Sequence, residues 1–179
     1  MARRDTSARR YAEAAFEIGR ADGTLDAWER DMATLAETLH HPELRSLLQH
    51  PAIPFADKER VLRRVMGRGV AAAPINLVLL MVRRGRPGAI DRMIERFTEL
   101  LRRHRGIALA EVRTALRLDD RQRAEIVSRL RTLTGSQIEV AETVDPDLIG
   151  GIAVRIGDQL YDASVRSRLE RLRARLTTV

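Results

Sequence analysis

Two aspartates that flank a proline are the first residues of this chain that could do chemistry. Asp145 and Asp147 lie on either side of Pro146, and a pair of carboxylates can transfer protons or hold a hard metal ion. Proline also fixes φ, and an aspartate beside it accepts a backbone hydrogen bond that closes a turn. We therefore expect a turn here, and neither a catalytic pair nor a metal site.

The glycines that follow could cradle a phosphate group. Gly150, Gly151 and Gly157 lie close together, but the chain contains neither G-x-G-x-x-G nor G-x-x-x-x-G-K-[ST], and these glycines lead into strand-like alternation rather than into a helix. We expect no nucleotide cofactor. The pair at 150–151 instead predicts a positive φ or a close backbone approach, and Gly157 predicts a hairpin turn.

Ser164 and the histidines complete the candidates for chemistry. A nucleophilic serine needs a general base and an oxyanion hole, and no G-x-S-x-G surrounds Ser164, which precedes a helical pattern and is expected to be its N-cap. The histidines lack the H-E-x-x-H spacing of a zinc site; they are His40, His41, His50 and His104. The sequence thus predicts no catalytic residue, no cofactor and no bound metal.

Composition excludes further classes of protein. The 179 residues include no cysteine, which excludes disulfides and thiolate metal sites. No apolar run approaches the ~20 residues that span a bilayer, and the basic N-terminus lacks the apolar region of a signal peptide. Only 3% of residues are aromatic, so the core is expected to be aliphatic and rich in alanine.

The formal net charge is +7, and nearly all positive charge is arginine, since Lys58 is the only lysine. Basic and acidic residues are interspersed, which is typical of solvated helix faces. The arginines of 166–175 lie around their helix without aromatic neighbours. They suit water or an acidic protein partner, while a basic nucleic-acid-binding module remains the alternative function.

Apolar spacing predicts a mainly α fold in two domains. Residues 1–105 form an N-terminal six-helix bundle, and residues 106–179 form a small α/β domain with a short sheet. The expected helices of the bundle cover about 7–20, 24–40 with Thr24 as cap, a short helix that carries Leu44, Leu47 and Leu48 and stops at Pro51, and then 57–66 with Asp57 as cap, 74–84 and 88–104. The second domain is expected to have strands at 107–118, 138–141, 152–156 and 159–162 and helices at 119–134 and from 164 onward.

Two helices of the bundle carry more apolar surface than one core face needs. The apolar arc of the first spans roughly 200°, and the fifth is apolar from Ile75 to Val82 at every position except Asn76. Such helices are either central in the bundle or leave a groove for the amphipathic helix of a partner. The sequence alone leaves both readings open.

Three stretches share their pattern with a known family. They are A-x-x-Y-A-x-A-x-F at residues 8–16, the segment from Asn76 to Arg86, and G-G-I-A-V-R-I-G-D at 150–158 with Y-D-A-S-V at 161–165. In this order they resemble the delta subunit family of bacterial F-type ATP synthase, whose mitochondrial counterpart is the oligomycin-sensitivity-conferring protein. One departure is Arg83-Arg84, where relatives often carry a less basic pair.

The resemblance implies a stator component without catalytic activity, present as one copy per complex. Its N-terminal domain would bind N-terminal helices of the alpha subunits, and its C-terminal domain would bind the b subunits of the peripheral stalk, so that the catalytic head does not rotate with the central rotor. Membrane association would occur only through the complex, at the cytoplasmic face of the bacterial cell membrane. No nucleic acid is expected as a partner.

A stator link needs permanent apolar contacts, because exposed ion pairs contribute only about 0–1 kcal/mol each. The first and fifth helices, which carry surplus apolar surface, are therefore the expected site of alpha-subunit binding. The positions that we expect to contact the alpha subunits are Tyr11, Ala14, Ala15, Ile18, Val78, Met81 and Val82. The last helix of the C-terminal domain is expected to face the stalk.

Overall fold

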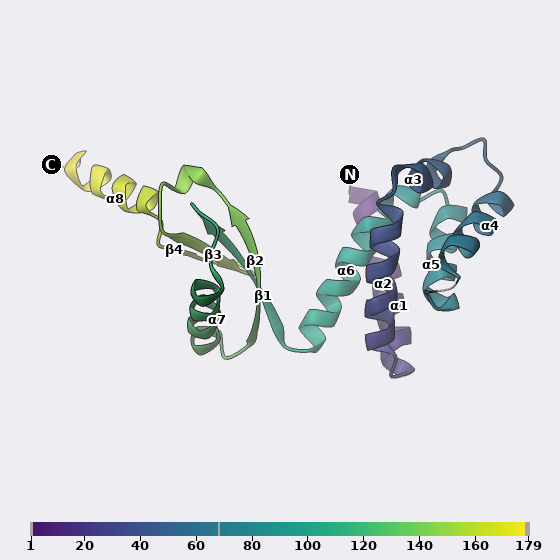
Figure 1. The fold of residues 1–179 in the computed structure, drawn as a ribbon, viewed down its shortest axis with the longest axis horizontal. Helices are drawn as coiled ribbons and strands as arrows, with labels where there is room; N and C mark the ends of the chain where they lie inside the picture. Colours follow the sequence, from purple (N-terminus) through teal and green to yellow (C-terminus); the bar gives the residue numbers. More distant parts are fainter. Residues whose placement is uncertain (1, 68, 178–179) are drawn as a thin grey trace. The chain divides into compact units, whose positions relative to one another are not determined.

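The protein is mainly α-helical, with a small sheet toward the C-terminus (Figure 1). The computed structural model describes residues 2–67 and 69–177. It divides into two compact units, Met1–Leu101 and Arg102–Val179. Among the described residues, no helix is long and apolar enough to cross a membrane.

Six α-helices form the described part of the bundle, as the sequence predicts. They are α1 (Ala2–Ala21), α2 (Leu25–Leu39), α3 (Pro42–Gln49), α4 (Phe55–Met66), α5 (Ala72–Arg83) and α6 (Ile90–His104), with the 3-10 turn η1 (Pro87–Ala89) before α6. The starts of α1, α4 and α5 differ from the prediction, and α1 begins at Ala2 rather than near residue 7. Pro54 rather than Asp57 precedes α4, and α5 begins before Pro74, because a proline in the first turn loses no helical hydrogen bond.

The core of the bundle is aliphatic around one aromatic cluster. Phe97 is fully buried, and its ring centroid lies 6.5 Å from that of Phe16 and 6.1 Å from that of Trp28. Helix α1 contributes mainly alanines, of which Ala8, Ala12 and Ala15 are fully buried. Helix α1 contacts α2, α5 and η1, and its small side chains allow these neighbours to approach closely.

The single lysine of the chain is buried at the end of α3. Lys58 Nζ donates hydrogen bonds to the carbonyl oxygens of Leu48 at 3.0 Å and His50 at 2.7 Å. The last carbonyls of a helix have no partner within the helix, and a cation at this end also interacts favourably with the helix dipole. A compact ammonium can bond both carbonyls from one point, which the larger planar guanidinium of arginine is less suited to do.

We expect Lys58→Met to lower the free energy of unfolding by about 1–3 kcal/mol, because one buried and one partly buried carbonyl oxygen lose their donor while the packing of the stem is kept. Urea unfolding followed by circular dichroism measures the change. Arg64→Met, at an exposed position of the same helix, is the matched control and should change stability by less than about 0.5 kcal/mol. Equal unfolding midpoints for the two variants would contradict this role of Lys58.

The C-terminal unit is built on a four-stranded sheet with the order β2-β1-β3-β4 among the described residues. The strands are β1 (Ile107–Thr114), β2 (Gln137–Val144), β3 (Ile152–Ile156) and β4 (Gln159–Asp162). Strands β1 and β2 are parallel and pair Ala110 with Val140, whereas β3 is antiparallel to both β1 and β4. Strand β1 is shorter and β2 longer than the sequence predicts, because residue-by-residue parallel pairing gives the two strands the same length.

Helix α7 (Asp120–Thr134) connects the two parallel strands and packs Leu130 against Ala110 and Val112 of the sheet. It starts with a capping box: the Asp119 carboxylate accepts from the Gln122 N–H at 2.7 Å, and Gln122 Oε1 accepts from the Asp119 N–H at 3.0 Å. The start at Asp119 is therefore confirmed. The 3-10 turn η2 (Pro146–Leu148) precedes β3, and α8 (Val165–Thr177) follows β4.

Candidate functional site

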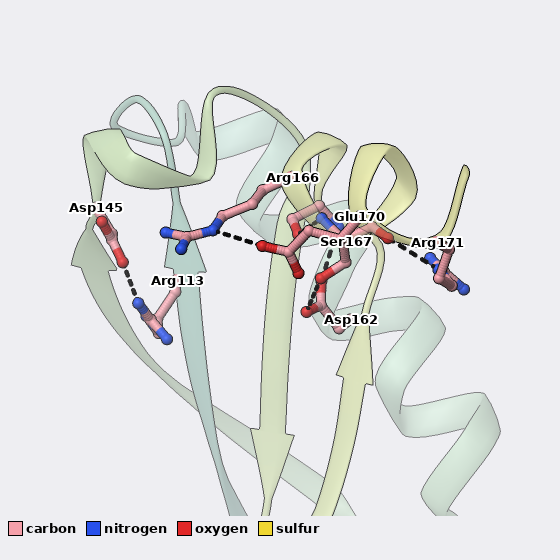
Figure 2. A network of polar contacts seen from close by, with 8 residues as sticks. Arg113, Asp145, Asp162, Arg166, Ser167, Glu170 and Arg171 are labelled. Carbon is pink, nitrogen blue, oxygen red and sulfur yellow. Dashed lines mark hydrogen bonds and ion pairs between the residues drawn. The ribbon is translucent and has the colours of Figure 1, made fainter. Parts of the chain in front are cut away.

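The paired aspartates form the turn that the sequence predicts. The Asp145 carboxylate accepts a hydrogen bond from the Asp147 N–H at 3.0 Å and forms an ion pair with Arg113 (Figure 2). The hydrogen bond from Arg113, assisted by that from the Asp147 backbone, holds the pKa of Asp145 below its usual value. This carboxylate is thus stabilised in its charged form at the surface, where it orders the turn before η2.

The glycine pair at 150–151 lies where two backbone segments approach closely, as the sequence predicts. Gly151 has φ +77°, and a Cβ atom there would lie 2.5 Å from the Ala163 carbonyl oxygen. Two hydrogen bonds close the contact: Ala163 N–H donates to Ile152 O at 2.9 Å, and Val165 N–H donates to Gly150 O at 2.9 Å. The first residue of α8 is therefore bonded directly to the segment that leads into β3.

Ser164 is the N-cap of α8, as predicted, and it is buried. Asp162, which is exposed, is a second capping residue that the sequence analysis missed. The Ser164 Oγ accepts from the Ser167 N–H at 3.2 Å. The Asp162 carboxylate accepts from the Ser164 N–H at 2.9 Å and from the Ser167 hydroxyl at 2.6 Å (Figure 2). These hydrogen bonds, that from the Ser167 hydroxyl first, lower the pKa of Asp162 to about 2. The signal in the sequence is the spacing D-x-S-x-x-S.

Gly151→Ala should destabilise the C-terminal unit by at least about 2 kcal/mol, because the new Cβ meets a carbonyl oxygen and the backbone keeps a positive φ. Gly157→Ala is the control, since Gly157 also has a positive φ but open space around it, and it should cost only about 1 kcal/mol. Urea unfolding curves give both values. A smaller loss for Gly151→Ala than for Gly157→Ala would refute the close backbone contact.

The pKa of Asp162 predicts how stability depends on pH. The folded pKa of about 2 lies below the unfolded value of 3.8, so the contribution of this carboxylate is present above pH 4 and is lost as the pH falls toward 2. Asp162→Asn should therefore lower the urea midpoint at pH 6, and the gap between the variant and the unmodified protein should narrow between pH 4 and pH 2. A gap that stays constant over this range would show that the ionised carboxylate contributes no stability.

Several arginines form short-range ion pairs on exposed helix faces, as the interspersed charge predicts. Pairs one helical turn apart are Arg9–Glu13 at 2.7 Å, Arg63–Glu59 at 2.8 Å, Arg129–Glu125 at 2.6 Å and Arg166–Glu170 at 3.1 Å. Such exposed pairs contribute little stability each. Positive charge that alternates with acidic residues in this way does not form the continuous basic stripe of a nucleic-acid site.

The positions expected to bind the alpha subunits fall into two groups. Ala15, Val78, Met81 and Val82 are buried in the bundle's own core. Tyr11 is half-buried, Ala14 is exposed, and Ile18 is 49% exposed. The bundle therefore buries much of the apolar surplus of α1 and α5 itself, because these two helices pack against each other and against α2.

The remaining apolar surface of α5 lies on a face that the sequence analysis did not select. Leu80 is exposed, and Leu77 is half-buried. In a helix that is apolar almost all round, periodicity gives no signal for which side meets the core. Only the packing of α5 against its neighbours distinguishes Leu80 from Val78 and Val82.

The C-terminal unit exposes a second apolar surface around α8 and β4. Leu160 and Tyr161 of β4 and three residues of α8, Val165, Leu169 and Leu172, are exposed. An open, mainly apolar hollow of about 360 Å³ lies between α7 and the sheet, with Leu133 and Tyr161 on its rim. Exposed apolar surface of this kind is a candidate interaction site.

Comparisons with known proteins find relatives that match nearly the whole chain. The sequence model of a family described as ATP synthase delta (OSCP) subunit matches residues 8–176. The ATP synthase subunit delta of Salinibacter ruber is 37% identical over 173 residues, covering 96% of this chain and 90% of that protein. That of Desulforamulus reducens is 34% identical over 174 residues, covering 97% and 96%. A solved chain of the Toxoplasma gondii mitochondrial ATP synthase hexamer has the same fold, with a TM-score of 0.74 and 24% identity over 95% of this chain and 97% of that one.

Proposed function

Since this chain belongs to the ATP synthase delta (OSCP) subunit family, we propose that it is a non-catalytic stator link of the synthase. It joins the catalytic alpha/beta head to the b subunits of the peripheral stalk, so that the head does not turn with the central rotor. The observation that supports this role is the exposed apolar helix surface on each unit, around Ile18 in the first and around Leu169 in the second.

The N-terminal unit binds N-terminal helices of the alpha subunits through α1 and α5. Tyr11, Ala14 and Ile18 recur at helical spacing on α1, so they form one stripe that an amphipathic helix can cover. The four buried positions, Ala15, Val78, Met81 and Val82, belong to the core of the bundle and support the packing of α1 and α5. Apolar contact suits a link under torque, because it does not depend on exposed ion pairs.

The C-terminal unit binds the b subunits, and one copy of the protein serves each complex. The assembly lies at the cytoplasmic face of the bacterial cell membrane, and the protein is held there only through its partners. The two units thus have separate tasks, one on the head and one on the stalk. A variant on one unit should leave the partner of the other unit bound.

We expect Ile18→Asp to weaken binding of a peptide from the N-terminus of the alpha subunit at least tenfold, because a carboxylate replaces the most exposed large apolar side chain of the stripe. Isothermal titration calorimetry with the full chain measures the affinity. Val65→Asp, on the exposed side of α4, is the matched control and should bind like the unmodified protein. Equal affinities for all three proteins would remove α1 as the binding surface.

A further inference from the structure

The exposed apolar residues of α8 follow a heptad spacing. Val165, Leu169 and Leu172 are separated by four and then three residues, the d-a-d spacing of a coiled-coil seam. Leu169 is 52% exposed and Leu172 is 54% exposed. Helix α8 meets its own unit at η2 and extends away from the sheet beyond that contact (Figure 1). The seam is therefore formed on the helix and is left without a covering helix in the described residues.

Arginine occupies the positions beside this seam. With Leu169 at a, the e positions are Arg166 and Arg173, and the preceding g position is Arg168; all three are exposed. The acidic residue of this stretch, Glu170, falls at b, outside the flanks. Its ion pair with Arg166 is exposed on both sides (Figure 2), and a partner can replace such a pair at little cost. Residues at e and g select the partner helix by charge.

The base of the seam contains an unusual backbone. Ile149 has φ 64° although it is not glycine, and it is 67% exposed. A β-branched residue rarely adopts this conformation, and the strain at such a position often serves a function. The next residue, Gly150, lies against Val165: a Cβ atom there would be 3.2 Å from Val165 Cγ2. The strained residue is therefore exposed, and it directly precedes the glycine that lies against the first residue of the seam.

We infer that α8 is one strand of a short coiled coil whose other strand is an acidic amphipathic helix of a partner. The partner helix places apolar side chains on Val165, Leu169 and Leu172, and it places glutamate or aspartate opposite the flanking arginines. The same arginines oppose pairing of two copies of α8, because like charges would face each other across the seam. The inference rests on the proposed stalk-binding role of the C-terminal unit and specifies the helix that this unit accepts.

The first turn of α8 is already ordered for such a contact. The backbone contact at Gly151 and the hydrogen bonds of Asp162, Ser164 and Ser167 fix the start of the helix. A helix that is held in its bound conformation loses less entropy on binding. A short seam, which spans the eight residues from Val165 to Leu172, can therefore contribute measurable affinity.

Two synthetic peptides test the inference against the full chain by fluorescence anisotropy. Both are helical heptad peptides with leucine at a and d; one has glutamate at e and g, and the other has lysine. The glutamate peptide should bind at least tenfold more tightly than the lysine peptide, and the protein alone should remain monomeric in light scattering. Equal binding of both peptides, no binding of either, or self-association through α8 would overturn the inference.

Variants show whether the seam and its flanks carry the binding. Leu169→Asp should weaken binding of the glutamate peptide at least tenfold. Leu116→Asp, at an exposed position outside α8, should leave this binding unchanged. Arg168→Glu combined with Arg173→Glu should reverse the preference toward the lysine peptide, whereas Arg171→Glu, at a c position, should not. If Arg171→Glu changes the relative affinity for the two peptides as much as the double variant does, net charge rather than heptad position determines which peptide binds. That result would overturn the inference.

Binding to the b subunits separates this inference from the proposed function. If the unmodified protein binds the b subunits and Leu169→Asp binds them equally well, the stator role stands and the α8 seam is wrong. If the unmodified protein binds the glutamate peptide but not the b subunits, the seam accepts an acidic helix and the proposed stalk contact is wrong. Loss of b binding in Leu169→Asp but not in Leu116→Asp supports both.

Discussion

The close approach between the Gly150–Gly151 backbone and the Ala163–Ser164 backbone is the contact on which the C-terminal unit depends. No side chain fits at Gly151, and the hydrogen bonds that leave this contact join the start of β3 to the start of α8. Because α8 has few other contacts with its unit, this junction sets its direction. Asp162 and Ser164 then complete the helix N-terminus, so that the geometry of the exposed apolar face follows from a few backbone atoms.

The N-terminal unit follows a different principle, in which small side chains set how much apolar surface remains outside. Alanine on α1 lets α2, α5 and η1 approach closely around Phe97, and this packing covers most of the apolar arc of α1. What remains exposed, Ala14 and Ile18 beside the half-buried Tyr11, is a narrow stripe suited to one partner helix. A bundle can thus have a complete core and still bind a partner with its most apolar helix.

Charge is used sparingly in both units, although the net charge is +7. Several exposed arginines pair one turn away with acidic residues and contribute solubility more than stability. A cation stabilises local structure here where it meets specific acceptors. Lys58 donates hydrogen bonds to two carbonyl oxygens at the end of α3, and Arg113 pairs with Asp145 and orders its turn. On α8 the arginines can select a partner helix because they flank an apolar seam. The same residues spread over a helix without an apolar stripe would select no partner.

The sequence by itself determined the order and type of nearly every element, the caps at Asp119 and Ser164, the turn at Asp145 and the family. These features depend on local signals: apolar spacing, capping residues, and glycines at positions that need them. Only the tertiary structure decided that β1 and β3 lie at the centre of the sheet and that α5 turns Val78 and Val82 inward and Leu80 outward. Strand order depends on pairing between distant segments, and a helix that is apolar on all sides has no periodicity to read. Its exposed face exists only once its neighbours have packed against it.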